Sequence, residues 1–156
     1  MSEAVRVRLA ALEDVPTIVG QRHAMFAEMG DGTPESLDRM DVGFAPWLVE
    51  KMAAGEYLGW FALDDDGQPV AGVGLWVQHW PVGPVDQTGR RAYLMNVYTE
   101  PHWRKRGLAR TLVRVALDWS REQGLRTALL NASSAGRPVY ESLGFRPSGE
   151  MRLKLD

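Results

Sequence analysis

The chain has 156 residues, of which 45% are apolar and 24% are charged, and its formal net charge is -2. These values are typical of a water-soluble globular protein, and the length predicts a single domain over residues 1–156. The sequence contains no cysteine, which excludes disulfide bonds, thiolate metal ligands and a cysteine nucleophile within this chain. The small net charge argues against binding to nucleic acid or to an anionic membrane surface.

The sequence predicts no targeting or membrane-spanning segment. Its first residues lack the apolar run of a signal peptide, and no stretch approaches the roughly 18 consecutive apolar residues of a membrane helix. We therefore expect a cytoplasmic protein that does not interact with membranes.

A short strand and two helices are predicted first. Residues 5–9 alternate between apolar and basic side chains, as in a strand. Apolar residues at helical spacing predict an amphipathic helix from Glu13 or Asp14 to about residue 29.

The second helix is expected over residues 35–54. Thr33 has the side chain of an N-cap and precedes a proline, which suits the first helical position. Gly43 and Pro46 lie in the middle of this segment, so we expect the helix to be broken or kinked there.

Three strands follow, joined by a tight turn and a longer loop. The turn contains three aspartates and a glycine, and the loop is rich in proline and glycine. The strands cover residues 57–63, 70–77 and 92–99, the turn residues 64–67, and the loop residues 80–89.

The remaining segments alternate between helix and strand. They are a helix over residues 108–122 that stops at Gly124, a strand over 126–131, a short helix over 134–143, and two final strands, the second over 151–155. Hairpins combined with one strand–helix–strand crossover predict an α/β (α+β) fold around one mixed sheet.

A basic turn separates the strand over 92–99 from the helix that follows it. Arg104, Lys105 and Arg106 precede Gly107, and Ala109 lies in the first helical turn. The first N–H groups of a helix have no internal partner and carry a partial positive charge, so cations are unfavourable there without an anion. The small residues allow close approach to the backbone. The turn therefore predicts a phosphate or pyrophosphate site.

This turn and a second motif resemble the GNAT superfamily of acyl-CoA N-acetyltransferases. Residues 104–109 read Arg-Lys-Arg-Gly-Leu-Ala, like the Gln/Arg-x-x-Gly-x-Gly/Ala turn of the family, and Pro101 precedes them as is usual. Residues 140–145 read Tyr-Glu-Ser-Leu-Gly-Phe, like the family's Tyr-Glu-x-Leu-Gly-Phe motif. One helix and one strand separate the two motifs, as in the family. The resemblance implies a mixed central sheet of six to seven strands flanked by about four helices.

The resemblance also implies a surface for acetyl-CoA. The pyrophosphate would lie on the backbone N–H groups of the basic turn, and the pantetheine arm would pair with the strand over 92–99 like an additional strand. A serine stands at the position where many relatives carry a pantetheine-binding asparagine. The implied residues are Val97, Tyr98, Thr99, Arg104, Lys105, Arg106, Gly107, Leu108, Ala109, Arg110, Asn131 and Ser133.

Tyr140 is the catalytic residue that the resemblance implies. It would protonate the departing thiolate of coenzyme A, and a backbone N–H near the same strand would polarise the acetyl carbonyl. A phenol of pKa about 10 stays protonated at pH 7 and suits a thiolate whose conjugate acid has a pKa of about 8.5. Direct transfer is expected, because the chain has no cysteine to form an acyl-enzyme.

The acceptor side is less defined by the sequence. The resemblance implies a primary amine, carried by a small molecule or a peptide N-terminus, and allows a homodimer. Glu28 is a candidate to hold an ammonium group, and Trp76 to line the acceptor pocket. Met95 and Asn96 stand where some relatives have a glutamate base. Five candidates for the base therefore remain: Glu28, His79, Asp86, Glu100 and His102.

Two other functions are compatible with parts of the sequence. An acyl-CoA-binding sensor without turnover would need only the coenzyme turn, although Tyr140 argues against it. A toxin that acetylates charged tRNA would want an extended basic surface, which the net charge does not favour. The three histidines lack the spacing of metal ligands, and we expect no metal.

Overall fold

The computed structural model describes residues 5–156 and contains one five-stranded sheet in the order β1-β2-β3-β4-β5. Neighbouring strands are antiparallel except β4 and β5, which are parallel and are connected through α3. Crossovers of this kind join parallel strands of one sheet. The strands are β1 Arg6–Leu9, β2 Tyr57–Leu63, β3 Pro69–His79, β4 Arg90–Thr99 and β5 Ala128–Leu129.

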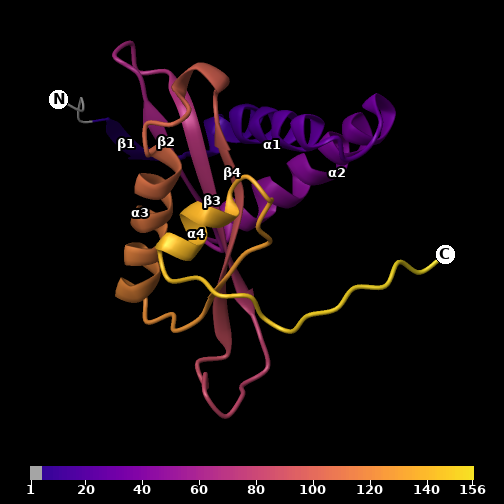
Figure 1. Cartoon of the computed structure of the whole chain (residues 1–156), viewed down its shortest axis with the longest axis vertical. Helices are drawn as coiled ribbons and strands as arrows, with labels where there is room; N and C mark the ends of the chain where they lie inside the picture. Colours follow the sequence, from indigo (N-terminus) through magenta and orange to yellow (C-terminus); the bar gives the residue numbers. More distant parts are fainter. Residues whose placement is uncertain (1–4) are drawn as a thin grey trace.

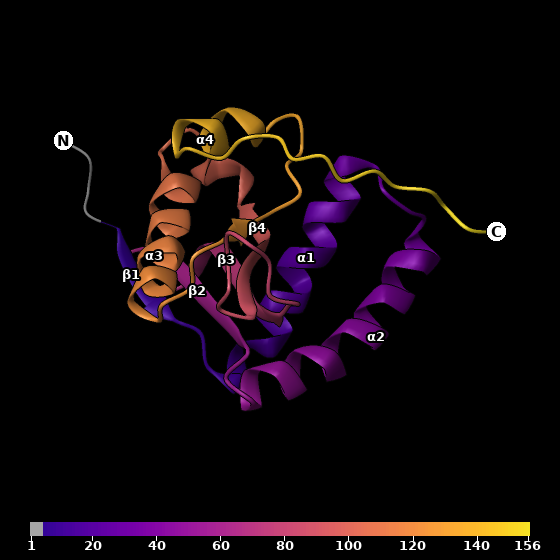
Figure 2. The same ribbon diagram turned by 90° about the horizontal axis from the view of Figure 1, so that it is seen from below.

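The helices cover both faces of the sheet. Helices α1 and α2 form a hairpin on one face, whereas α3 and α4 lie on the other (Figures 1 and 2). Two short 3₁₀ turns, Leu12–Asp14 and Pro101–Trp103, precede α1 and α3. The helices are α1 Val15–Met29, α2 Pro34–Ala53, α3 Leu108–Glu122 and α4 Arg137–Ser142.

Each face of the sheet has its own apolar core. On one face, the buried side of α3 meets the inner residues of β3 and β4, and Tyr140 of α4 joins this cluster. On the other face, Ile18 of α1 and Phe44 and Leu48 of α2 pack against Tyr57 and Phe61 of β2. The two layers hold β4 in the middle of the molecule, between the helical hairpin and α3.

Helix α2 is continuous over 20 residues, so the expectation of a break at Gly43 or Pro46 is wrong, whereas the alternative, a kink, stays a prediction. Both residues lie on the exposed side of the helix, where a missing N–H bond is tolerated better than in a core. The opposite side is held by buried apolar residues, and Thr33 caps the start by accepting a hydrogen bond from the Ser36 N–H (3.2 Å). Tertiary burial outweighs the local signal.

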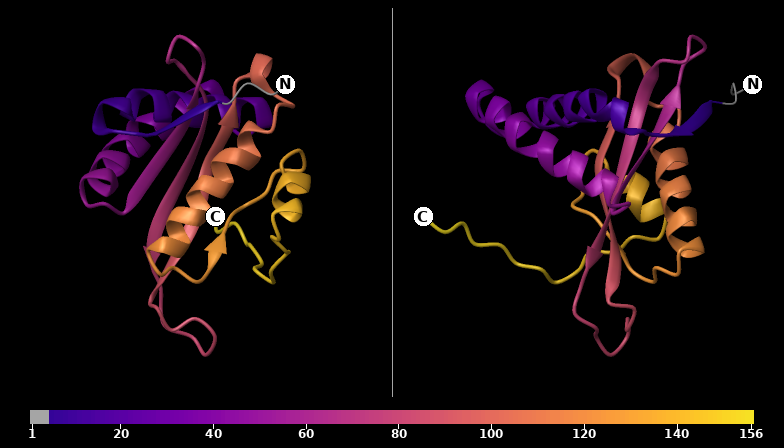
Figure 3. Two further views of the ribbon diagram at one scale, coloured as in Figure 1. Left: turned by 90° about the vertical axis from the view of Figure 1, so that its left-hand side faces the viewer. Right: turned by 180° about the vertical axis from the view of Figure 1, so that it is seen from behind.

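The mixed α/β fold is confirmed, but the sheet has five strands rather than six or seven. The strand predicted over 126–131 is reduced to Ala128–Leu129, and the two expected after residue 145 do not form. The last residues run away from the body in an extended course (Figures 1 and 3). An isolated segment cannot form a strand without an edge to pair with, and this one lies beside none. Within residues 5–156, no helix is long and apolar enough to cross a membrane.

Candidate active site

Strand β4 has an open edge over most of its length. It pairs with β5 only through Ala92 with Ala128 and Tyr93 with Leu129. Beyond Tyr93 the chain after β5 departs, and at that point the Asn131 side-chain amide donates a hydrogen bond to the Tyr93 hydroxyl (2.8 Å). Residues 94–99 are therefore paired with β3 alone, which leaves backbone groups on the other side for an extended ligand.

The chain leaves β4 through a turn that ends at an uncapped helix. Lys105 and Gly107 both have a positive φ, 63° and 75°. The first intrahelical hydrogen bond of α3 runs from the Thr111 N–H to the Gly107 carbonyl, so the three preceding N–H groups have no partner within the helix. The first turn contains no acidic residue, and Gly107 provides no capping side chain. This geometry suits an anion.

Two of the three cations of the turn are held by the protein. Arg104 donates to the Glu28 carboxylate (Nη2–Oε2, 2.6 Å) and to the Thr99 carbonyl (Nε–O, 2.9 Å). Arg106 donates to the His102 carbonyl (3.2 Å). Glu28 thus lies at the basic turn, where it also accepts a hydrogen bond from Tyr98 (3.4 Å). Its suggested contact with an ammonium acceptor stays a prediction.

We expect Glu28→Gln to tighten coenzyme A binding by about two- to fivefold, because Arg104 would be released toward the phosphates. The two side chains are 42% and 43% exposed, so the free energy of unfolding should change by less than about 1 kcal/mol. Calorimetry would measure the affinity. Asp118→Asn is the matched control, since it removes one charge from an exposed pair with Arg121 at the other end of α3. Weaker binding in Glu28→Gln would mean that Glu28 positions Arg104 for the phosphates.

A bulge interrupts β4 next to its open edge. The register shifts between Gly72 and Gly74, which pair with Tyr98 and Met95, so β4 contains one more residue than β3 in this interval. Asn96 lies in the bulge with φ 56°, a left-handed conformation that asparagine adopts more readily than most residues. Bulges re-aim backbone groups, so this site is suited to direct an N–H toward a ligand on the open edge.

The bulge rests on a polar network under the helical hairpin. The buried Asn96 side chain accepts a hydrogen bond from Arg22 (2.8 Å) and donates one to the Tyr57 hydroxyl (2.9 Å). The Arg22 guanidinium lies between the rings of Phe26 and Phe44, at 4.9 and 4.6 Å from their centroids. Burial lowers the pKa of Arg22 and raises the pKa of Tyr57 to about 12. No local sequence signal indicates this network, because Arg22 and Tyr57 are 74 and 39 residues from Asn96.

We expect Asn96→Ala to lower the free energy of unfolding by about 3 kcal/mol. It removes two hydrogen bonds from buried partners, one of them charged, and forces alanine into a left-handed conformation. Asn96→Gly loses the same bonds but adopts a positive φ freely, so it should be about 1 kcal/mol more stable than Asn96→Ala. Urea unfolding measures both. Wild-type stability in both variants would contradict the importance of the network.

Tyr140 lies in the short helix α4, on the α3 side of the sheet. Its side chain is 9% exposed and meets the ring of Phe145 edge-to-face, with centroids 6.1 Å apart. Burial raises the pKa of Tyr140 above its ordinary value. Within residues 5–156 its hydroxyl makes no hydrogen bond, and the hydroxyl oxygen is not fully enclosed by the protein. The hydroxyl is therefore available to a ligand.

Ser133 lies just before the turn that leads into the same helix. Its hydroxyl accepts a hydrogen bond from the Gly136 N–H (3.1 Å), and its carbonyl accepts one from the Arg137 N–H (3.0 Å). The residue thus orders the turn that leads to Tyr140. Whether it also contacts the coenzyme stays a prediction.

Trp76, the aromatic residue proposed for the acceptor side, lies on the opposite face of the sheet from Tyr140. Trp76 of β3 packs edge-to-face against Trp47 of α2 (5.2 Å) and Tyr93 of β4 (6.4 Å), in an aromatic cluster that anchors the helical hairpin. A separate hollow of about 240 Å³ lies in the loop between β3 and β4, where Arg91 stacks on Trp80. Trp76 does not line this hollow.

The candidates for the general base are scattered by the fold. His79 and Asp86 lie at the β3–β4 loop. Glu100 and His102 shortly precede the basic turn in the chain, and Glu28 of α1 reaches the turn through its ion pair with Arg104. Hydrogen bonds from Thr127 and Thr88 lower the pKa of Asp86, which makes it a weaker base. None of the five is part of the network at the bulge, so the geometry identifies no base.

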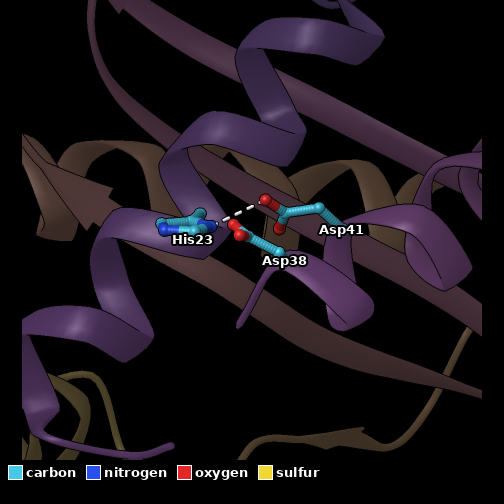
Figure 4. A group of neighbouring side chains, drawn as sticks. All are labelled: His23, Asp38 and Asp41. Carbon is cyan, nitrogen blue, oxygen red and sulfur yellow. Dashed lines mark hydrogen bonds and ion pairs between the residues drawn. The ribbon is translucent and has the colours of Figure 1, made fainter. Parts of the chain in front are cut away.

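The fold brings together one cluster of possible metal ligands that the spacing of residues in the sequence does not indicate. The α1–α2 hairpin brings ligand atoms of His23, Asp38 and Asp41 within 4.8 Å of one another (Figure 4). The His23 Nδ1 and an Asp41 carboxylate oxygen are 2.6 Å apart, which links the two helices. His23 is 15 positions from Asp38 and 18 from Asp41, so linear spacing could not indicate that the histidine lies beside the two aspartates. The expectation of no metal stays a prediction.

An open strand edge that leads into a basic, uncapped helix start is an arrangement that suits an extended anionic ligand. The model of the acetyltransferase (GNAT) family matches residues 23–145. The chain therefore belongs to the GNAT acetyltransferase family, as the sequence motifs predicted.

Solved structures agree with this assignment. A GCN5-related N-acetyltransferase from Ralstonia eutropha JMP134 is 33% identical, with a TM-score of 0.91 over 97% of this chain and 99% of that one. A predicted acetyltransferase from Clostridium acetobutylicum, solved with acetyl-CoA, is 26% identical, with a TM-score of 0.88 over 98% and 96% of the two chains.

Curated relatives are matched over part of their length. Glucosamine 6-phosphate N-acetyltransferase of Trypanosoma brucei brucei is 31% identical over 98 residues, which is 62% of this chain and 63% of that protein. Human N-acetyltransferase 8 is 27% identical over 73 residues, which is 45% of this chain and 32% of that protein.

Proposed function

We propose that residues 1–156 form one N-acetyltransferase domain, which transfers the acetyl group of acetyl-CoA directly to a primary amine. The observation that carries the proposal is the open edge of β4, which has the bulge at Asn96 at one end and the free N–H groups of α3 at the other. This edge offers backbone partners to an extended arm and an anion site to its phosphates. The Clostridium acetobutylicum relative, solved with acetyl-CoA, supports the choice of donor.

The residues present fit the coenzyme. The N–H groups of Leu108, Ala109 and Arg110 are the natural partners of the pyrophosphate, and Lys105 and Arg106 add positive charge beside them. The backbone of Val97 to Thr99 would pair with the pantetheine arm along the unpaired edge. Asn131 lies at the point where β4 and β5 separate, and it would contact the end of the pantetheine arm that is farthest from the pyrophosphate.

The transfer needs three contributions at the thioester. An N–H at the β4 bulge would stabilise the negative charge that develops on the acetyl oxygen. The amine nitrogen forms the new bond to the acetyl carbon as the bond from that carbon to sulfur breaks. The Tyr140 hydroxyl would give its proton to the departing sulfur, and bulk solvent would restore it. The geometry identifies no base, so an ammonium acceptor would first lose one proton to solvent, and the attacking nitrogen would lose a further proton to solvent as the amide forms.

The acceptor is proposed as a class only. The trypanosomal relative is named for an amino sugar phosphate, which supports a small-molecule amine. The aromatic residues Trp47 and Trp76 and the network under the bulge lie on the face of α1 and α2, where we place the approach of the amine. Peptide N-termini belong to the same chemical class.

A panel of primary amines with acetyl-CoA tests the proposal. It should include amino sugars and their phosphates, polyamines, amino acid derivatives and short peptides, with released coenzyme A detected by a thiol reagent. The cysteine-free chain adds no thiol of its own to the signal. At least one amine should give thiol release well above hydrolysis, together with an acetylated product in mass spectrometry.

The outcome separates the enzyme from a sensor. Tight coenzyme A binding by calorimetry, with hydrolysis alone across the whole panel, would favour a non-catalytic acyl-CoA-binding module. Met95 and Asn96 stand where some relatives carry a glutamate base, and the lack of a carboxylate there is the observation that keeps this second candidate. Absence of both binding and turnover would contradict both functions.

A further inference from the structure

Arg22 of α1 is a cation whose hydrogen bonds are only partly satisfied. Its Nη1 donates to the Asn96 side chain in the bulge of β4 (2.8 Å). Its Nε is enclosed by the protein and has no partner, and within residues 5–156 its Nη2 makes no hydrogen bond. An enclosed donor without an acceptor is costly, and more so on a charged group. The missing partner of Arg22 therefore comes from outside the chain.

The free donors of Arg22 lie on one edge of the guanidinium. The group is planar, and the N–H of Nε runs parallel to one N–H of Nη2, whereas Nη1 lies on the other side. This is an edge at which arginine binds two oxygens of a carboxylate or a phosphate. The rings of Phe26 and Phe44 flank the guanidinium, with centroids 4.9 and 4.6 Å from Cζ, so a partner would approach in its plane.

No carboxylate of the chain occupies this edge. In the described part of the chain, Arg22 forms no ion pair. Burial lowers the pKa of Arg22, and the Asp41 carboxylate opposes this only in part. One Asp41 oxygen is bonded to His23 (2.6 Å, Figure 4), and the other is enclosed without a partner. A buried cation without an ion pair is stabilised when a ligand supplies the opposite charge.

We propose that Arg22 binds an acidic group of the acceptor, so that the amine acetylated by this protein carries a carboxylate or a phosphate. The inference rests on the proposed function, since it places the acceptor on the face of α1 and α2. Arg22 is bonded to Asn96, in the bulge whose N–H would hold the acetyl oxygen. An acid bound at Arg22 would orient the amine toward the acetyl carbon, and it would lie a few bonds from the amine. Arg22 would thus select among amines and take no part in the proton transfers.

Paired acceptors and one conservative variant test this role. Amino acids are compared with their amides, and amino sugar phosphates with the unphosphorylated sugars. Arg22→Lys keeps the charge but loses the paired N–H groups, so kcat/KM should fall about 30-fold or more for the acidic amines, mainly through KM. It should fall less than about threefold for the neutral amines. The pair that shows the loss identifies the acid as a carboxylate or a phosphate. Equal losses for acidic and neutral amines would overturn the proposal, because Arg22 would then only support the bulge.

Arg8→Lys is the matched control. Arg8 donates from both ends of its guanidinium to Asp14 (2.7 and 2.9 Å), and its Cζ lies 5.2 Å from the centroid of the Phe61 ring. The same substitution therefore removes a paired contact beside an aromatic ring, on β1 and outside the candidate site. Arg8→Lys should keep the wild-type preference for acidic amines. A preference lost equally in both variants would contradict a specific role for Arg22.

A binding measurement on the wild type does not depend on turnover. The Arg22 Nε–H gives a proton–nitrogen NMR signal, which is assigned through the carbons of its own side chain. With coenzyme A present, glycine and glucosamine 6-phosphate are added in separate titrations, and glycinamide and glucosamine serve as neutral controls. A shift with an acidic probe alone supports the site. The same shift without acetylated product from any amine would contradict the proposed function and leave the anion site standing. No shift with either acidic probe would overturn the inference, whatever the amine panel shows, and would mean that water satisfies the enclosed Nε.

Discussion

Replacing Gly107 with leucine is expected to weaken coenzyme A binding by about 100-fold or more, measured by calorimetry. A Cβ atom at this position meets no protein atom within 4 Å, so the new side chain would point into the space beside the free N–H groups of α3. In our proposal the pyrophosphate occupies that space. The side chain would exclude it from the backbone.

The control for this variant is the glycine that follows the other end of the same helix. Gly124, after the end of α3, has φ 78° against 75° for Gly107, and its Cβ would also meet open space. Gly124→Leu therefore carries the same left-handed strain, about 1–2 kcal/mol, far from the basic turn. Both variants should lose similar stability, whereas only Gly107→Leu should lose the coenzyme. Equal affinity in the two variants would remove the turn as the pyrophosphate site.

Local signals predicted the part of the site around α3. A helix is specified by its own spacing of apolar residues and by its terminal residues, so α3 has nearly the bounds expected and Gly124 follows its end in a left-handed conformation. Thr33 likewise caps α2 as predicted. The basic turn is equally local, because its cations and Gly107 are neighbours in the chain.

Contacts between distant segments could not be predicted in this way. Asn96 bonds to Arg22 and Tyr57, which are 74 and 39 residues away. The one local signal was an asparagine inside an apolar strand pattern, a residue that strands disfavour and bulges accept. Glu28 and Arg104 are 76 residues apart, so nothing near either residue indicates their ion pair.

The two strands expected after residue 145 were predicted from a local pattern but do not form. The alternation over residues 151–155 is a real strand pattern, but hydrogen bonds to a neighbouring edge decide whether a strand forms. Residues 146–156 do not reach such an edge. The alternation thus predicted that the segment can form a strand, and the lack of a neighbouring strand edge explains why it does not.

Tyr140→Phe is expected to lower kcat by about 100-fold or more while the affinity for coenzyme A changes little. The phenyl ring keeps the edge-to-face contact with Phe145 and the place in the core, so only the hydroxyl is lost. Phe145→Leu is the matched control, because it alters the packing and leaves the proton donor. If the two variants lose similar activity, Tyr140 acts through packing and is not the acid.

The pH dependence of kcat provides an independent test of the same role. A proton donor works only while it is protonated, and burial raises the pKa of Tyr140 above the ordinary value of about 10. Deprotonation of Tyr140 should therefore cause no loss of kcat as the pH rises from 7 to about 10, and activity should fall only above that range. An alkaline limb near pH 8 that disappears in Tyr140→Phe would contradict the raised pKa. A limb at the same pH in both proteins would belong to another group, because the phenylalanine has no proton to lose.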